Sequence, residues 1–312
     1  SYVINHNSLS MPLVSISINP EYLWDDQIGI YTTGQNGSSL SGEWGSISGW
    51  GIANYWQDWE RPAHIEYFNK YGQLKFSTEM GIKMHGGFSR TYPQKSMSLH
   101  CRPKYGLEQI EHQIFSDKPI ESFSSLLLRN SGNDNIAYAE SGTMMRDGLV
   151  STLISTSTDI DRQSYKPSVV YINGEYWGIY NIRERTNKDF IDINHNLNNV
   201  DLDILGYKYD MSYVIEGSSD AYDDIFNYIA SNDITQNNTY LYLNSLIDIN
   251  QLIDYLIVQI FFGVIDWPQN NIKLWKPILS GKWRWILYDT DSCFFHRPEI
   301  NNFISRVFAN EE

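Results

Sequence analysis

Residues 266–291 read DWPQNNIKLWKPILSGKWRWILYDTD, and this stretch decides how the second half of the chain folds. Two apolar, aromatic-rich runs, Ile272–Ile278 and Trp283–Tyr288, lie on either side of the residues LSGK. Gly281 in that short segment can adopt positive φ, so the segment indicates a tight turn. We therefore expect an antiparallel hairpin in which the second run returns alongside the first.

Polar side chains gather at the open end of this expected hairpin. Asp266 and Asn271 precede the first strand, and Asp289 and Asp291 follow the second. Placing carboxylate and amide oxygens against an apolar hairpin costs free energy of desolvation unless a cation neutralises them. The stretch therefore predicts a cation-binding site at the open end of the hairpin.

The composition of the chain limits the kinds of partner it can have. Its 312 residues, 42% of them hydrophobic, suffice for a large buried core in one big domain or two lobes. A formal net charge of −14 argues against binding to nucleic acid and against docking on anionic membranes, since both need a basic surface. The best apolar stretch, residues 252–265, contains Asp254 and is too short to span a membrane. Cys101 and Cys293 are too few for a disulfide framework, and whether they form one bridge stays open.

The order of predicted elements indicates an α+β protein with two lobes. Residues 1–186 are rich in strand patterns and include one predicted helix, near residues 138–155. Residues 187–312 have mainly helical patterns and carry the hairpin described above. We therefore expect a β-rich N-terminal lobe, a mainly helical C-terminal lobe and a cleft between them.

Turn residues set the boundaries of the strands that we expect in the first lobe. Asn173-Gly174 is a strong signal for a two-residue hairpin turn. Further turns are expected at residues 69–73 and near Gly81, and the Gly-, Ser- and Trp-rich residues 35–60 read as an exposed loop. Beyond these, we expect a strand, an acidic turn and a short strand in residues 11–34, and helices at residues 221–231 and 249–265.

The polar residues of the hairpin match the spacing of a phosphoryl-transfer site. In protein kinases a catalytic Asp is followed five residues later by an Asn that binds Mg²⁺, then by a hairpin and a second Asp that binds Mg²⁺. Asp266 and Asn271 have this spacing, and Asp289 follows the hairpin, with Asp291 as a further oxygen donor. Mg²⁺ prefers oxygen ligands, which explains the residue types. The competing interpretation is that Asp266 and Asn271 form a turn and that the later Asp residues cap a strand.

A second candidate site lies in residues 81–101, which read GIKMHGGFSRTYPQKSMSLHC. The backbone at Gly86-Gly87 can approach phosphate oxygens closely, and Ser89 and Arg90 add hydrogen-bond donors. Lys95 begins the following strand, from which its ammonium group could reach back to the phosphates as the strand lysine of kinases does. An ordinary hairpin with glycine in its turn would give the same pattern. Joined to the hairpin site, the segment predicts the nucleotide-binding part of a phosphotransferase.

A kinase lysine needs an acidic partner, and three residues are candidates for that role. Glu140 and Asp147 are seven residues apart, which places them on one face of the expected helix. Glu184 lies near the junction of the two expected lobes and could instead contact the ribose or adenine of a nucleotide. The sequence does not decide between them. The histidines lack metal-ligand spacing, so no zinc site is expected.

Blocks of sequence along residues 11–295 together match the pattern of a known family. They include GIKMHGGFSRTYPQKSMSL, SLLLRNSGNDN, YINGEYWGIYNIRER, DWPQNNIKLWK and WRWILYDTD. These blocks resemble the CotH family, which is named for a bacterial spore-coat protein. The resemblance implies an atypical protein kinase, secreted or on a bacterial cell surface, that uses Mg²⁺ to transfer phosphate from ATP to Ser or Thr of a protein. It places the catalytic Asp of the family at Asp266, its metal-binding Asp at Asp289 and its phosphate-loop lysine at Lys95.

Two departures from the family keep other interpretations open. The sequence ends soon after Asp289, where family members usually continue with further helices. The block of sequence before the glycine-rich turn at Gly86 is also long. The alternative is a catalytically silent surface module that binds a glycan or a protein through loop tryptophans, namely Trp44, Trp50, Trp56 and Trp59. A third interpretation is a glycosyltransferase with Asp289 and Asp291 as a metal-binding D-x-D motif. It would need an α/β nucleotide-binding sheet before the motif, and the helical pattern there argues against one.

Overall fold

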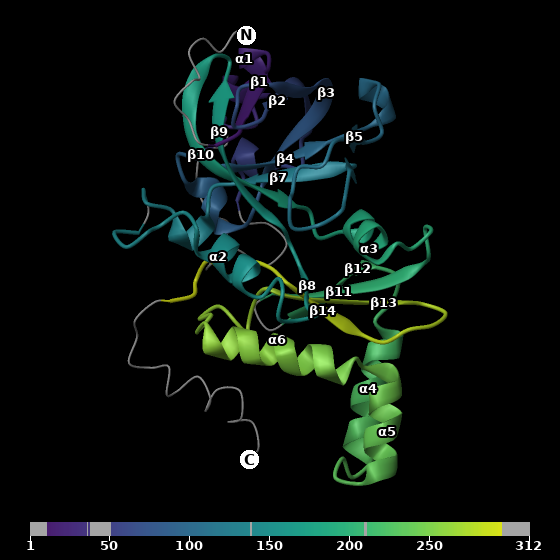
Figure 1. Cartoon of the computed structure of the whole chain (residues 1–312). Coiled ribbons are helices and arrows are strands. Elements are labelled where there is room, and N and C mark those ends of the chain that lie inside the picture. Colours follow the sequence, from purple (N-terminus) through teal and green to yellow (C-terminus); the bar gives the residue numbers. More distant parts are fainter. Residues whose placement is uncertain (1–10, 36, 38–50, 138, 209–210, 295–312) are drawn as a thin grey trace. The chain divides into compact units, whose positions relative to one another are not determined.

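The computed structural model describes residues 11–294, except for residues 36, 38–50, 138 and 209–210. The chain divides into two compact units, each of which is described by itself. Unit 1 contains residues 1–148 and 164–185, and unit 2 contains residues 149–163 and 186–312. Strands and helices are both present (Figure 1), as expected for an α+β protein.

Unit 1 is built on a closed barrel of strands in the order β1-β2-β3-β4-β7-β10-β9. Neighbouring strands are antiparallel except β1 and β9, whose parallel pairing of Leu13 with Val169 closes the barrel. Closure leaves no unpaired edge in this sheet. The strands are β1 (Leu13–Ser17), β2 (Arg61–Phe68), β3 (Leu74–His85), β4 (Ser96–His100), β7 (Ser125–Arg129), β9 (Tyr165–Ile172) and β10 (Glu175–Glu184).

Apolar side chains from one face of each strand fill the core of unit 1. In β3, Met80, Ile82 and Met84 belong to this core, and in β4 Met97 and Leu99 do so. Burying each such side chain contributes roughly 1.5–3 kcal/mol. Because strand side chains alternate between two faces, the residues between them project from the other face. These residues are Lys83 and His85 of β3, and Ser96, Ser98 and His100 of β4.

The hairpin turns predicted for unit 1 are confirmed at two places and wrong at a third. Asn173 and Gly174 have positive φ angles of 51° and 84°, which suit a two-residue turn of type I′. Residues 69–73 join β2 to β3, with the Gly72 N–H donating to the Asn69 carbonyl. At Gly81, however, β3 continues without a turn. A Cβ there would lie 2.5 Å from Glu60 Cδ, so this glycine permits a close approach rather than a turn.

The N-terminal residues of unit 1 differ from the sequence prediction. Residues 11–34 form β1 and helix α1 (Pro20–Trp24) instead of two strands. The Asn19 side chain caps α1 by accepting a hydrogen bond from the Glu21 N–H. Residues 35–60 lie partly outside the described residues, and their described part includes the buried Asn54 and Tyr55 in η1 (Asn54–Trp56). The remaining short elements of this unit are η2 (Phe88–Thr91), η3 (Pro103–Tyr105), β5 (Ile110–Glu111), β6 (Ser122–Phe123) and η4 (Gly132–Asp134).

Helix α2 (Arg146–Leu153) is shorter than the helix predicted near residues 138–155. The buried Asp134 carboxylate accepts hydrogen bonds from the backbone N–H groups of Thr143, Met145 and Arg146. These bonds satisfy donors at the start of α2 and hold the preceding residues in a loop. Gly142 is needed in that loop, because a Cβ there would lie 2.7 Å from the carbonyl carbon of Asn135.

Unit 2 contains a five-stranded sheet in the order β12-β11-β13-β14-β8. The main hydrophobic core of unit 2 contains Tyr255 and Val258 of helix α6, and Trp283 and Trp285 of the hairpin region. The strands are β8 (Asp161–Arg162), β11 (Leu202–Lys208), β12 (Met211–Glu216), β13 (Ile272–Pro277) and β14 (Arg284–Leu287). The helices are α3 (Lys188–His195), α4 (Asp220–Ser231), α5 (Asn237–Leu246) and α6 (Ile249–Phe261).

The prediction that residues 187–312 are mainly helical is incomplete, because β11 and β12 were not expected. The pattern of β11 is interrupted by Asp203 and Gly206, which are poor strand formers. Asp203 is nevertheless buried and accepts a hydrogen bond from the Ser218 N–H. The described residues of β12 are exposed, so this strand carries no alternating burial pattern. Helices α4 and α6, in contrast, agree with the sequence prediction.

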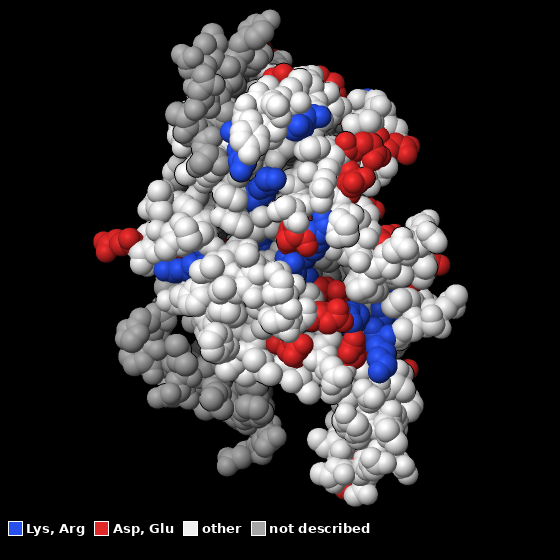
Figure 2. Space-filling model, viewed as in Figure 1, with Lys and Arg blue, Asp and Glu red and all other residues white. Residues whose placement is uncertain are grey.

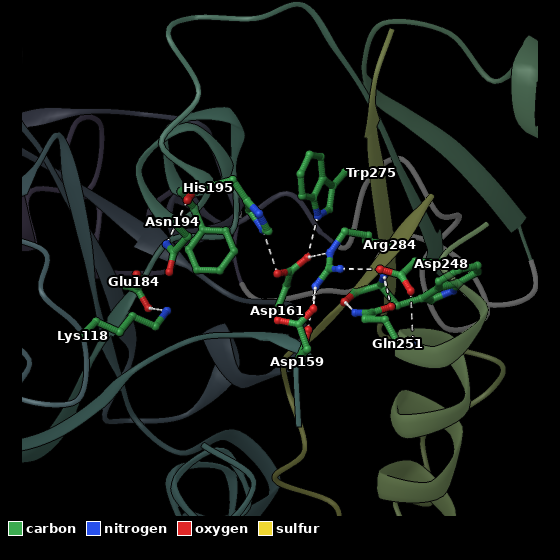
Figure 3. A network of polar contacts seen from close by, with 12 residues as sticks. Lys118, Asp159, Asp161, Glu184, Asn194, His195, Asp248, Gln251, Trp275 and Arg284 are labelled. Atoms are coloured by element: carbon green, nitrogen blue, oxygen red, sulfur yellow. Dashed lines mark hydrogen bonds and ion pairs between the residues drawn. The ribbon is translucent and has the colours of Figure 1, made fainter. Parts of the chain in front are cut away.

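A buried carboxylate, that of Asp161 in β8, joins several elements of unit 2. Its oxygens lie 2.8 Å from His195 Nε2, 2.8 Å from Trp275 Nε1 and 3.2 Å from Arg284 Nε (Figure 3). Arg284 also pairs with Asp248 at the start of α6, at 2.5 Å. Burial opposes ionisation of Asp161, but the contacts with His195 and Arg284 hold the pKa of its carboxyl below the usual value. This network fixes β8, β13, β14, α3 and α6 to one another.

Surface charge is unevenly distributed over the elements of unit 2. No Lys or Arg occurs between Lys208 and Lys273. The viewed face of α4 and α5 is almost free of charged side chains (Figure 2). Phe226 of α4 and Tyr240 and Tyr242 of α5 are exposed. Among the described residues, no helix is long and apolar enough to cross a membrane. Both cysteines, Cys101 and Cys293, are buried free thiols.

Candidate functional site

The predicted hairpin of unit 2 is confirmed. Strands β13 and β14 are antiparallel, with Leu274 opposite Trp285. Gly281 in the connecting turn has φ of 111°, a conformation that L-residues rarely adopt. Asn271 directly precedes β13, and Asp289 lies two residues after the end of β14. Both residues therefore flank the open end of the hairpin, one on each strand, and their joint role in a metal site stays a prediction.

Asn271 and Asp289 share an uncommon backbone conformation. Their φ angles are 59° and 58°, in the left-handed region. Asn and Asp tolerate this region better than other residues with a Cβ, but a cost of about 1 kcal/mol or more remains. Such outliers cluster at functional sites, because the surrounding fold holds them where their side chains are needed. The conformation supports a functional interpretation of both residues.

Asp266 follows α6 and lies close enough to Asp289 for the two carboxylates to influence each other. Burial raises the pKa of Asp266 from 3.8 to about 6, and the negative charge of Asp289 adds to this rise. The nearby Ser292 side chain acts in the opposite direction. A carboxyl with such a pKa is ionised at neutral pH and can accept a proton more readily than an ordinary Asp. Sequence reasoning missed Ser292, although it follows directly on the Asp289–Asp291 motif.

The residues after Asp289 form a buried turn. Thr290, Asp291 and Ser292 are each at most 2% exposed. The Cys293 N–H donates to the Thr290 carbonyl, and the Ile265 N–H donates weakly to the Ser292 carbonyl at 3.5 Å. These bonds tie the segment that carries Asp266 to the turn that carries Asp291.

The carboxylates of this site fit a metal ion that is held in part by a nucleotide. Among the described residues, no three His, Cys, Asp or Glu side chains form a metal-binding group. These residues therefore provide no complete protein cage for an ion. Mg²⁺ bound together with a nucleotide needs only one or two carboxylates, because phosphate oxygens and water complete its octahedron. A bound cation would relieve the mutual repulsion between the Asp266 and Asp289 carboxylates.

The glycine turn predicted to bind phosphate is present in unit 1, after β3. Gly86 has φ of 103°, and a Cβ there would lie 2.8 Å from Ser89 Oγ, so only glycine fits without rearrangement. Gly87 follows it and precedes η2. Arg90 points toward the protein: its Nε donates to the Gly86 carbonyl, and its Nη1 donates to the carbonyls of Tyr55 and Trp56. The guanidinium thus holds the turn against η1.

Lys95 is also engaged within unit 1. Its Nζ donates to the carbonyls of Arg90 and Tyr92, at 2.7 and 2.8 Å, and lies 4.3 Å from the centroid of the Tyr55 ring. Lys95 is only 5% exposed, and burial lowers the pKa of its ammonium group to about 8. Two of its three protons are therefore committed to the backbone. Its expected contact with phosphate stays a prediction, and the ammonium group would have to make it with its third proton or give up one of these bonds.

None of the three acidic residues proposed as partners of Lys95 pairs with it. Glu140 is exposed. Asp147 forms ion pairs with Arg129 of β7, at 3.2 Å, and with Arg183 of β10, at 2.6 Å. The buried Glu184 pairs with Lys118 at 2.6 Å and accepts a hydrogen bond from the Ser164 N–H. The Asp147 carboxylate of the helix therefore forms ion pairs with two arginines in strands, Arg129 and Arg183, which the sequence analysis did not identify.

The tryptophans proposed as binding residues divide into two groups. Trp44 and Trp50 lie outside the described residues. Trp56 and Trp59 are partly buried against the core of unit 1. Arg90 lies over the Trp56 ring at 5.8 Å and Arg61 over the Trp59 ring at 5.2 Å. These two tryptophans have a structural role in unit 1.

The candidate residues of both units fall within one stretch that matches a known family. Residues 82–301 match the family described as CotH kinase protein. This chain belongs to the CotH family. The match includes the glycine turn and Lys95 of unit 1 as well as the hairpin of unit 2 with Asp266 and Asp289. A comparison with curated proteins found no match. The resemblance to the CotH family is thus confirmed over most of this chain. The description of the family includes the word kinase.

Proposed function

We propose that this CotH family member is a Mg²⁺-dependent protein kinase. It would transfer the γ-phosphate of ATP to Ser or Thr of a protein, outside the cytoplasm or on the surface of a bacterial cell. The observation that carries the proposal is the pair Asp266 and Asp289, one with its pKa raised to about 6 and the other in a left-handed conformation at the end of a hairpin. Two neighbouring carboxylates in different environments suit two different roles.

Asp266 is assigned the role of orienting the acceptor hydroxyl and accepting its proton. Its raised pKa makes it a better base than an ordinary Asp while leaving it ionised at neutral pH. Asp289 and Asn271 would hold the metal ion through side-chain oxygens, and the buried Asp291 is a third possible donor. Mg²⁺, when bound with ATP, neutralises the charge on the phosphate oxygens. The backbone of Gly86-Gly87 and the hydroxyl of Ser89 are the phosphate-binding candidates of unit 1.

Two conservative variants test this division of roles. Asp289→Asn should abolish the rise in melting temperature that ATP gives in the presence of Mg²⁺, because a ligand of the metal is weakened. Asp266→Asn should keep that rise but lose most phosphate transfer, because the residue that positions the hydroxyl is altered. Melting curves and transfer of labelled phosphate from ATP measure the two effects. Equal loss of the melting shift in both variants would refute the assignment of roles.

A second function, binding without catalysis, has one observation in its favour. Helices α4 and α5 expose Phe226, Tyr240 and Tyr242, and their viewed face is almost free of charged side chains (Figure 2), so this part of unit 2 could contact another protein. The wild-type protein separates the two functions. A kinase must show a melting shift with ATP and Mg²⁺, whereas a silent binding module shows none.

A further inference from the structure

The outward face of β3 and β4 in unit 1 carries polar residues instead of apolar ones. Lys83 lies opposite Ser98 in the sheet, and Gly81 lies opposite His100. Ser98 and His100 are buried, and the His100 Nε2 lies 2.9 Å from the Ser98 hydroxyl. Lys83 is three residues before the turn glycine Gly86. The polar face therefore begins beside the glycine turn.

Cationic side chains lie close enough to this face to lower the pKa values of two residues there. Burial lowers the pKa of His100 to about 4, and the charges of Arg185 and Arg102 lower it further. A hydrogen bond with Lys83 lowers the pKa of Asp58, and the charges of Lys83, Arg90 and Arg185 add to this effect. The charge of Glu60 acts on His100 in the opposite direction, although Arg102, Lys104 and Tyr105 bind its carboxylate.

The anion at Lys83 is Asp58, which comes from the segment after η1. The Lys83 ammonium and the Asp58 carboxylate form an ion pair. The Lys83 side chain is 18% exposed, whereas the Asp58 side chain is 89% exposed. An ion pair with one partner almost fully in water contributes little to stability. Arg90 keeps Asp58 within reach, because it binds the carbonyls of Tyr55 and Trp56 just before it.

We propose that Lys83 is a phosphate-binding cation of this protein and that Asp58 occupies it as an internal competitor. The ligand class is a polyphosphate, and ATP in particular, the donor in the proposed function on which this inference rests. A polyphosphate presents several anionic oxygens to the Lys83 ammonium group, whereas Asp58 makes one exposed contact with it. Lys83 thus takes the role that was predicted for Lys95, two of whose three ammonium protons are bound to carbonyls.

Binding of tripolyphosphate, measured by calorimetry at low ionic strength without metal, tests the competition. Asp58→Asn should tighten binding about five- to tenfold, since it removes one unit charge a few ångströms from the ligand. Asp201→Asn, which removes the same charge at an exposed site in unit 2, should change it less than about twofold. Lys83→Met should weaken binding at least about tenfold, whereas the exposed Lys70→Met should not.

The double variant Asp58→Asn with Lys83→Met gives the sharpest test, because competition for one ammonium group is not additive. The gain from Asp58→Asn should vanish when Lys83 is absent. An affinity of Asp58→Asn equal to that of Asp201→Asn overturns the proposal, even if the Lys83 variant fails to fold. So does absence of tripolyphosphate binding in both the wild type and Asp58→Asn.

The outcomes also separate this inference from the proposed function. Lys83-dependent binding without phosphate transfer from ATP supports the anion site and refutes the kinase. Transfer from ATP with an affinity that is independent of Lys83 and Asp58 supports the kinase and refutes the anion site.

Discussion

Replacing the proposed catalytic base should make the protein more stable at neutral pH. The pKa of Asp266 is 3.8 in an unfolded chain and about 6 in the fold, so the folded state disfavours its ionised form. Each pKa unit corresponds to about 1.4 kcal/mol, which gives a cost of about 3 kcal/mol once the group is ionised. Asp266→Asn keeps the shape of the side chain and removes the charge. We therefore expect its free energy of unfolding to exceed that of the wild type by up to about 3 kcal/mol at pH 7.5.

The pH dependence of this difference identifies its cause. A raised carboxyl pKa means that the folded state binds more protons than the unfolded state between pH 3.8 and about 6, so wild-type stability falls as pH rises through this range. The advantage of Asp266→Asn should accordingly shrink to about 0.5 kcal/mol at pH 4. Urea denaturation at both pH values measures it. A variant that is less stable than the wild type at pH 7.5, or a difference that does not change with pH, would refute this account of Asp266.

Three further predictions concern residues away from the carboxylate pair. Asp161→Ala should lower the free energy of unfolding by about 3–5 kcal/mol in urea denaturation, because it leaves Arg284 without its buried partner. Ala at the exposed Asp159 should lower it by less than about 1 kcal/mol. Similar losses in the two variants would contradict a stabilising role of the Asp161 network. Burial raises the pKa of Glu60, but hydrogen bonds from Lys104, Arg102 and Tyr105 outweigh this effect and lower the pKa from 4.5 to about 2. The Glu60 carboxylate therefore stabilises the fold above pH 4.5, and this stabilisation is lost as pH falls toward 2. Glu60→Gln should flatten the plot of unfolding free energy against pH in this range, and an unchanged slope would exclude the effect. Lys95→Met should lower the free energy of unfolding by about 1–3 kcal/mol, because two hydrogen bonds are lost. Thermal or urea unfolding measures this loss. A variant with full stability that no longer binds ATP would instead support a phosphate-binding role of Lys95.

The parts of the fold that the sequence predicts are those with a local signal. Asn173-Gly174 and Gly281 specify their turns through φ angles that other residues avoid, and the apolar pattern of α6 specifies a buried helix. The strands β11 and β12 carry no such signal, because one is interrupted by a buried Asp and the other is exposed. Their formation depends on the pairing of β11 with both β12 and β13, which a local pattern does not contain.

The candidate site shows the same division between local and long-range information. The spacing of Asp266, Asn271 and Asp289 in a hairpin could be predicted, since only neighbouring strands are involved. The engagement of Lys95 with nearby carbonyls could not, because its residue type equally suits an ion pair with phosphate. The pair of Asp58 and Lys83 joins residues that are 25 positions apart in the chain, and nothing in either local segment indicates it.

The course of the chain between the two units has a consequence for how such a protein can be inherited. Residues 149–163 belong to unit 2, although the residues on both sides of them belong to unit 1. They supply Val150, Ile154 and Ile160 to the core of unit 2 and Asp161 to its buried network. A gene fragment that began at Thr186 would encode unit 2 without these residues, and Arg284 would lose a buried counter-ion. A single recombination point therefore cannot separate the two units: a point before residue 149 also transfers residues 164–185 of unit 1, and a point before Thr186 leaves residues 149–163 behind.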